Sequence, residues 1–105
     1  MNTSTATETL NIAQTILDQI NASDFWARAR WGVKQSLATE TGLQMNCTKG
    51  IKIIVTLDPS DTYSIQVGRL VRKFDWSVKG EAEGIDADNL TRMIDGLFSK
   101  AFGAL

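Results

Sequence analysis

The apolar positions in the first part of the chain recur with the period of an α-helix. Thr5 and Glu8 have the spacing of a capping box, which predicts that a helix begins near them. From the length of 105 residues we expect a single domain over residues 7–105, preceded by a flexible N-terminus over residues 1–6. Five apolar residues follow the i, i+3, i+4, i+7 spacing of one helix face: Leu10, Ala13, Ile16, Leu17 and Ile20.

The next segment predicts a short second helix. Residues 21–24, NASD, combine a helix break with a new N-cap, which is either Ser23 or Asp24. Gly32 suits the end of this helix, because glycine readily adopts the left-handed conformation that follows a helix. The residues between them, Phe25–Trp31, are predicted to form about two turns of helix.

From residue 43 the apolar positions alternate with a period of two, which predicts β-strands. Two strands, over residues 43–48 and 51–57, are joined by a short turn at Lys49-Gly50. A third strand follows the turn residues 58–61, and a fourth follows Arg72-Lys73. Because such short connections join antiparallel neighbours, the pattern predicts a four-stranded antiparallel meander.

The C-terminal residues predict a second long helix. Asp86 or Asp88 lies near its start, and Gly103 lies at its end. An N-terminal helix, a short second helix, a four-stranded antiparallel meander and a C-terminal helix together predict an α+β fold whose helices cover one face of the sheet. The expected core is Leu10, Ile16, Ile20, Ile53, Val55, Ile65, Val67, Trp76, Leu90, Ile94 and Leu97.

One apolar residue falls on the outward side of this predicted sheet. Ile54 lies in the phase of its strand that is otherwise polar. Together with the three tryptophans of the chain, it indicates apolar surface that a second copy would cover. We therefore expect a homodimer.

Composition narrows the chemistry that the chain can perform. With no histidine and a single cysteine, Cys47, it cannot form an internal disulfide, a Cys/His zinc site or a histidine-based triad. Cys47 is in the inward phase of its strand, where it is expected to pack as a small apolar residue. The pairs Asp58/Asp61 and Asp86/Asp88 occupy turns and helix starts, which favour aspartate for local reasons. We predict no catalytic residue, no metal site and no cofactor, and hence a protein that is not an enzyme.

Charge is distributed unevenly along a chain whose formal net charge is −1. Residues 25–80 hold nine cations against four carboxylates, whereas residues 1–24 and 81–105 each have a net charge of −3. The total charge gives no general attraction to a polyanion, so any such binding would be local.

The segment Phe25–Lys34, FWARARWGVK, concentrates cations and aromatic side chains. On a helix its arginines lie three and four positions from its tryptophans, spacings at which a guanidinium stacks on an indole. In a functional interpretation these side chains form an exposed surface for an anionic ligand. In a structural interpretation the tryptophans are buried and the arginines pair with carboxylates of the terminal helices. The candidate binding residues here are Arg28, Arg30, Trp31 and Lys34.

A second basic cluster follows the third predicted strand. Arg69 shares the phase of Ile65 and Val67, so it is expected at the end of the core face, while Arg72 and Lys73 lie at a hairpin tip. These cations either form a solvated turn or join the first cluster in one patch, and the sequence leaves both arrangements open.

Two stretches carry a resemblance to a known group of proteins. DPSDTYSIQVGRL (Asp58–Leu70) and DWSVKGEAEGIDADNL (Asp75–Leu90) resemble small proteins of tailed bacteriophages and prophages. The shared motifs are short and structural in character, so the resemblance implies a phage context and no catalytic mechanism. They are Asp61-Thr62-Tyr63, Gly68-Arg69, Asp75-Trp76, Val78, Gly84-Ile85, Ala87-Asp88 and Leu90.

These observations favour a non-enzymatic accessory protein of phage type that binds a host or phage macromolecule, with inhibition as one mode of action. The alternatives are a nucleic-acid or nucleotide-binding protein that uses the basic–aromatic surface, and a virion component. The N-terminus lacks the features of a signal peptide, and no apolar run reaches the ~20 residues of a membrane span. We expect a cytoplasmic protein without a membrane partner, located in the host cytoplasm if it is phage-encoded.

Overall fold

The computed structural model describes residues 3–72 and 75–102. The helices are α1 (Thr3–Ser23), α2 (Ala27–Arg30) and α3 (Leu90–Phe102), with two short 3-10 turns, η1 (Thr48–Gly50) and η2 (Ala87–Asn89). The strands are β1 (Val33–Ala38), β2 (Gly42–Cys47), β3 (Ile51–Leu57), β4 (Tyr63–Arg72) and β5 (Asp75–Ile85). The predicted α+β fold is confirmed, with one strand more than expected. No helix within the described ranges has the length and apolar character needed to cross a membrane.

The strands form one antiparallel sheet in the order β1-β2-β3-β4-β5, so each strand pairs with the next along the chain. The predicted meander is therefore extended by β1, which the sequence pattern does not predict. Residues 33–38, VKQSLA, lack a sustained apolar alternation because the strand is mostly exposed at the edge of the sheet. Backbone pairing with β2, from Val33 opposite Cys47 to Ala38 opposite Leu43, forms this strand instead.

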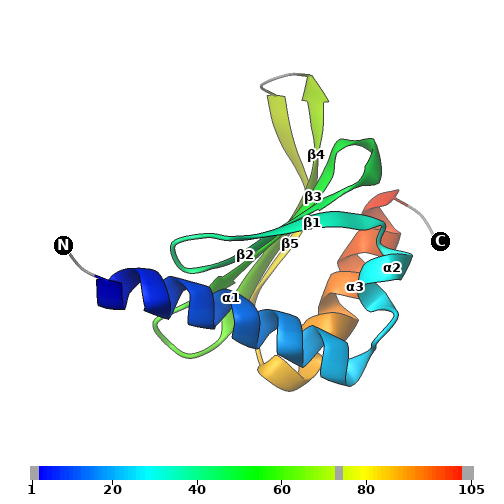
Figure 1. The fold of residues 1–105 in the computed structure, drawn as a ribbon. Helices are drawn as coiled ribbons and strands as arrows, with labels where there is room; N and C mark the ends of the chain where they lie inside the picture. The colour runs from blue at the N-terminus through cyan, green and yellow to red at the C-terminus, as the bar shows by residue number, and fades with distance from the viewer. Residues whose placement is uncertain (1–2, 73–74, 103–105) are drawn as a thin grey trace.

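The two long helices cover the same face of the sheet (Figure 1). α1 packs across β1 and β2, whereas α3 packs across β4 and β5, and the two helices also contact each other. The core lies between these layers, as expected. Leu97 is partly buried at its margin, and the Leu10 side chain is outside the described part of the chain. Eight predicted core residues are buried there: Ile16, Ile20, Ile53, Val55, Ile65, Val67, Leu90 and Ile94.

The expectation that Trp76 belongs to this core is wrong. Trp76 is only half-buried, and its ring lies over Gly68, where an added Cβ would be 2.7 Å from Cη2 of the indole. Gly68 alternates with the inward-facing Val67 and Arg69, so Trp76 covers the face of the sheet away from the helices. Irregular pairing between β4 and β5 shifts the register here, and a count of alternating positions cannot detect such shifts.

The segment around α2 differs from the prediction in length. α2 is a single turn, Ala27–Arg30, rather than about two turns, because Phe25 and Trp26 form a turn before it. Asp24 Oδ1 accepts a hydrogen bond from the Trp26 N–H at 3.0 Å, which holds that turn. Gly32 has a φ of 72°, as expected for a residue after a helix. α1 begins at Thr3 and so extends into segment 1–6, which places Thr5 inside the helix, and Gly103 lies outside the described residues.

Candidate binding cleft

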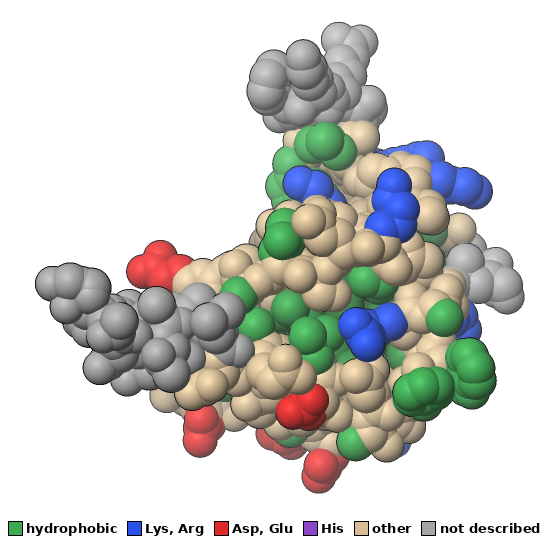
Figure 2. Space-filling view, in the orientation of Figure 1, with side chains coloured by type: hydrophobic (Ala, Val, Ile, Leu, Met, Phe, Trp, Pro, Cys, Tyr) green, Lys and Arg blue, Asp and Glu red, His purple; other side chains and the backbone are tan. Residues whose placement is uncertain are grey.

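Strand register separates the charges along the sheet. The Cα of Ile51 lies opposite that of Arg69, so the start of β3 and the end of β4 meet at one end, next to η1. The opposite end holds the turns at residues 39–41 and 58–62. Cations predominate at the first end, namely Lys34, Lys49, Lys52 and Arg69, although Asp75 at the start of β5 also lies there. Carboxylates gather at the second end, namely Glu40, Asp58, Asp61, Glu83 and Asp86. Figure 2 shows blue side chains in the upper right of one face and red ones along its lower and left margins.

A cleft of about 420 Å³ opens at the basic end, between α2, η1, the paired ends of β3 and β4, and the last turns of α3. Apolar side chains form its wall: Trp31, Ile51, Phe98, Ala101 and Phe102. Polar or small residues complete the lining: Arg30, Gly32, Thr48, Lys49 and Arg69. The cleft thus combines an apolar wall with a cationic rim, an arrangement that suits an anion attached to an apolar group.

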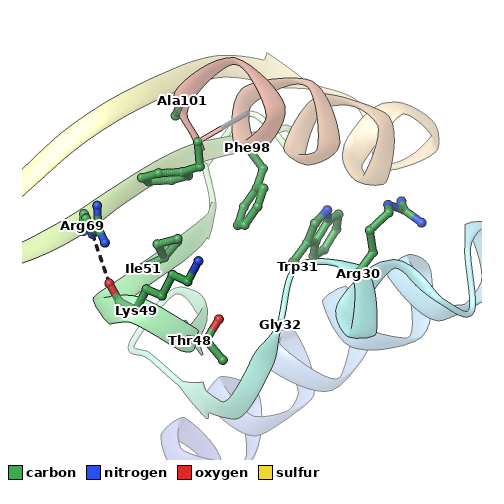
Figure 3. Close-up of a pocket in the computed structure, with 10 residues that line it drawn as sticks. Arg30, Trp31, Gly32, Thr48, Lys49, Ile51, Arg69, Phe98 and Ala101 are labelled. Carbon is green, nitrogen blue, oxygen red and sulfur yellow. Dashed lines mark hydrogen bonds between the residues drawn. The ribbon is translucent and has the colours of Figure 1, made fainter. Parts of the chain in front are cut away.

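Two of the cations face the cleft. Lys49 and Arg69 are both exposed, and the Arg69 Nε–H donates a hydrogen bond to the Lys49 carbonyl oxygen at 3.1 Å. Figure 3 shows the Lys49 side chain extending past Ile51 toward Phe98. The Arg69 guanidinium retains its Nη donors, so the pair presents two positive groups beside an apolar surface.

Arg30 also lines the cleft, but its charge is satisfied elsewhere. Its Nη2 pairs with Asp24 Oδ2 at 2.9 Å and its Nε with Asp95 Oδ1 at 3.1 Å, and Figure 3 shows the side chain pointing away from Lys49. The hydrogen bond to Asp24 is the main cause that raises the pKa of Arg30, and the same bond lowers the pKa of Asp24. Arg30 is therefore a structural cation that ties α2 to α3.

Trp31 belongs to the same structural unit. Its side chain is 1% exposed, and its indole Nε1–H donates to Asp95 Oδ1 at 2.9 Å. One carboxylate oxygen of α3 thus receives hydrogen bonds from both Arg30 and Trp31. The functional interpretation requires a partly exposed Trp31, and the structure contradicts it.

The other sequence candidates lie around the cleft or outside it. Arg28 is half-buried, and its Nε–H donates to Asn21 Oδ1 at 3.2 Å. Lys34 is exposed on β1 and does not line the cleft. Arg72 ends β4 with its Cα opposite that of Asp75, but its side chain is not described, and Lys73 lies outside the described residues. Among the candidates whose side chains the structure describes, Arg30, Trp31 and Arg69 line the same cleft, whereas Arg28 and Lys34 do not.

The segment FWARARW divides between the two interpretations. Trp31 is buried and Arg30 pairs with carboxylates, as the structural interpretation expects. Trp26, however, is 69% exposed and Phe25 is 72% exposed, and their rings form an edge-to-face pair with centroids 5.3 Å apart. The segment therefore has an inner end that locks α2 to α3 and an outer end that presents two aromatic rings to solvent.

Sequence reasoning missed Lys49 as a site residue and identified it only as part of a turn. The signal that could have identified Lys49 is its place before Gly50 in a hairpin turn. In the structure Lys49 has a φ of 62° and Gly50 a φ of 76°. The Ile51 N–H bonds to the Thr48 carbonyl, so the hairpin connection has the character of a type I′ turn. Asparagine is the usual residue at the first central position of such a turn, and lysine is an exception.

Two residues that line the cleft, Gly32 and Thr48, approach each other closely. Gly32, with a φ of 72°, lies so near η1 that an added Cβ would be 2.9 Å from Thr48 Oγ1. The positive φ and this contact both favour glycine at position 32. Gly32 thereby brings the end of α2 against the β2–β3 turn that carries Lys49.

Other reactive groups of the described chain are poorly placed for chemistry. Cys47 is buried, and burial raises the pKa of its thiol to about 11, so it is a thiol at neutral pH. Within residues 3–72 and 75–102, no cluster of three or more cysteine, aspartate or glutamate side chains is arranged to hold a metal ion. In comparisons with known proteins, no family model, no curated protein and no solved structure matches the chain.

Proposed function

We propose that the protein acts by binding an anionic protein partner at its basic end. The observation that carries this proposal is the meeting of Lys49 and Arg69, which come from separate chain segments, on the rim of one apolar cleft. Such a cleft holds an apolar group while two cations select a negative charge next to it. With the resemblance to phage proteins, this supports a non-enzymatic accessory protein whose partner is a host or phage macromolecule and which acts by occupying it.

The placement of the exposed aromatic residues favours a protein partner over nucleic acid at the cleft. Binding to single strands relies on exposed ring faces close to free cations, and the exposed rings of Phe25 and Trp26 do not line the cleft that Lys49 and Arg69 border. Polyphosphate binding also relies on several free cations, and Arg30 is already neutralised by two carboxylates. Nucleic-acid binding is the alternative that the test below addresses.

Charge reversal at the rim tests the proposed function. Tagged wild-type protein, Arg69→Glu and a matched control, Arg92→Glu, are incubated with bacterial lysate, with and without nuclease. Arg92 is exposed at the start of α3 and does not line the cleft. We expect a protein that wild type and Arg92→Glu capture at equal levels, that Arg69→Glu loses, and that nuclease leaves in place. Equal capture by Arg69→Glu, or loss on nuclease treatment, would contradict the proposal.

A further inference from the structure

The geometry points to Lys49 as the residue that selects the ligand of the cleft. We propose that Lys49 and Arg69 bind a side-chain carboxylate of an acidic polypeptide segment, while a neighbouring apolar side chain of that segment packs on the apolar wall at Ala101 and Phe102, which are half-buried. This inference rests on the proposed function and names the ligand class and the residue that selects it.

The backbone at Lys49 is the first argument. A φ of 62° is unfavourable for lysine, because its Cβ is too close to the following carbonyl oxygen in the left-handed region. Gly, Asn and Asp adopt this conformation more readily. Asp61, the other described non-glycine residue with positive φ, is in a loop where its residue type is favoured. Residues held in such conformations concentrate at functional sites. Asparagine would therefore adopt the backbone conformation at position 49 more readily than lysine does.

The side chain of Lys49 is the second argument. Its ammonium forms no ion pair with any described residue, although the carbonyl oxygen of the same residue accepts the Arg69 hydrogen bond. Figure 3 shows the ammonium directed past Ile51 toward Phe98, rather than out along the turn. An unpaired cation beside an apolar wall attracts a carboxylate more strongly than one surrounded by water.

The position of Arg69 is the third argument. Its Cα is opposite that of Ile51 on the helix-covered face, at the point where the buried alternation of β4 ends. Because its Nε is held by the Lys49 carbonyl, the guanidinium is oriented before any ligand binds. A carboxylate that bridges Arg69 and Lys49 would satisfy both cations at once.

Nuclear magnetic resonance titration of the whole chain, uniformly labelled with nitrogen-15, tests this ligand class. The probes are a peptide with one phenylalanine flanked by glutamates, the same peptide with glutamines in place of the glutamates, and oligothymidylate of equal charge. We expect saturable shifts of the Gly50, Ile51 and Phe98 amides with the acidic peptide alone. Shifts with oligothymidylate but not with the peptide, equal shifts with the glutamine peptide, or no shifts with any probe would overturn the inference.

Replacement of the strained lysine provides a second readout. Lys49→Asn should raise Tm by about 3 °C, because asparagine adopts the turn conformation more readily. The same change should weaken the affinity for the acidic peptide about tenfold or more, because one of the two cations is lost. Lys79→Asn, an exposed lysine of β5 outside the cleft, should leave peptide affinity unchanged. If Lys49 instead served only to complement the C-terminal end of α3, Lys49→Asn would lower Tm, and the inference would be wrong.

The lysate experiment separates the two levels of the argument. Capture that Arg69→Glu loses and Lys49→Asn retains would refute the role of Lys49 and leave the proposed function standing. Capture that all three of Arg69→Glu, Lys49→Asn and wild type share would refute both.

Discussion

At the scale of single residues, Asp95 holds the inner end of the basic–aromatic segment in place. Its Oδ1 accepts hydrogen bonds from Arg30 Nε and from the buried Trp31 Nε1. The sequence gives no sign of this link, because 64 and 65 positions separate the partners. This link explains why the FWARARW segment contributes Arg30 and Trp31 to the lining of the cleft but no arginine that is free to bind a ligand there.

Removal of the Asp95 carboxylate should destabilise the fold. Asp95→Ala leaves the Trp31 indole N–H buried without a partner and Arg30 with one carboxylate, which should lower the free energy of unfolding by about 1–2 kcal/mol. Chemical denaturation measures this change, with Asp88→Ala, an exposed aspartate of η2, as the control. Equal stability of the two variants would show that the link contributes nothing.

Asp24 should give the stability a dependence on pH. Its pKa is lowered from 3.8, first by the hydrogen bond from Arg30 and then by that from the Trp26 backbone N–H. A carboxyl whose pKa is lower in the folded state stabilises the fold above its unfolded pKa, and this contribution is lost as pH falls through the folded pKa. The Tm difference between wild type and Asp24→Asn should therefore be constant above about pH 5 and shrink below 3.8. A difference that grows on acidification would contradict this assignment.

At the scale of elements, sequence periodicity predicted the parts whose faces are clearly divided between core and solvent. α1, α3 and the strands β2 to β4 have such faces, and their inward positions are buried as expected. β1 has no such division, because it lies at the sheet edge. The cleft could not be predicted at all, since its lining comes from four segments between residues 30 and 102 whose meeting is set by tertiary packing.

Glycines provide a paired test of this packing. At Gly42 an added Cβ would collide with the Val55 carbonyl oxygen of the neighbouring strand, whereas at Gly96, in α3, nothing lies within 4 Å. Gly42→Ala should therefore lower Tm strongly, because backbone atoms cannot move aside. Gly96→Ala should stabilise the helix by about 0.5–1 kcal/mol. Thermal melts check both, and a mild effect at Gly42 would mean that β2 and β3 are less closely apposed.

At the scale of the whole molecule, exposed apolar groups provide candidate surfaces for the predicted homodimer. Ile54 is half-buried on the sheet face away from the helices, and the Phe25–Trp26 pair is exposed beside α2. We predict a dimer whose interface includes Ile54, so that Ile54→Gln shifts the equilibrium toward monomer while Phe25→Gln leaves it unchanged. Light scattering over a concentration series measures this. A wild-type protein that stays monomeric at high micromolar concentration would rule the dimer out.

The overall charge is uninformative for this molecule, whereas its arrangement is not. A net charge of −1 conceals a sheet in which strand register places more cations than carboxylates at one end and carboxylates at the other. Binding at the basic end should therefore weaken as salt rises, even though the chain is nearly neutral.

The most direct test of the account is to locate the glutamate-flanked phenylalanine peptide on the protein. Intermolecular nuclear Overhauser effects report which protons of the chain lie next to the peptide ring. We predict contacts from the ring to the Ala101 and Phe102 side chains, within the cleft that Lys49 and Arg69 border. Contacts to Ile54 or to the Phe25–Trp26 pair instead, or no contacts in a saturated sample, would contradict the assignment of the cleft as the binding site.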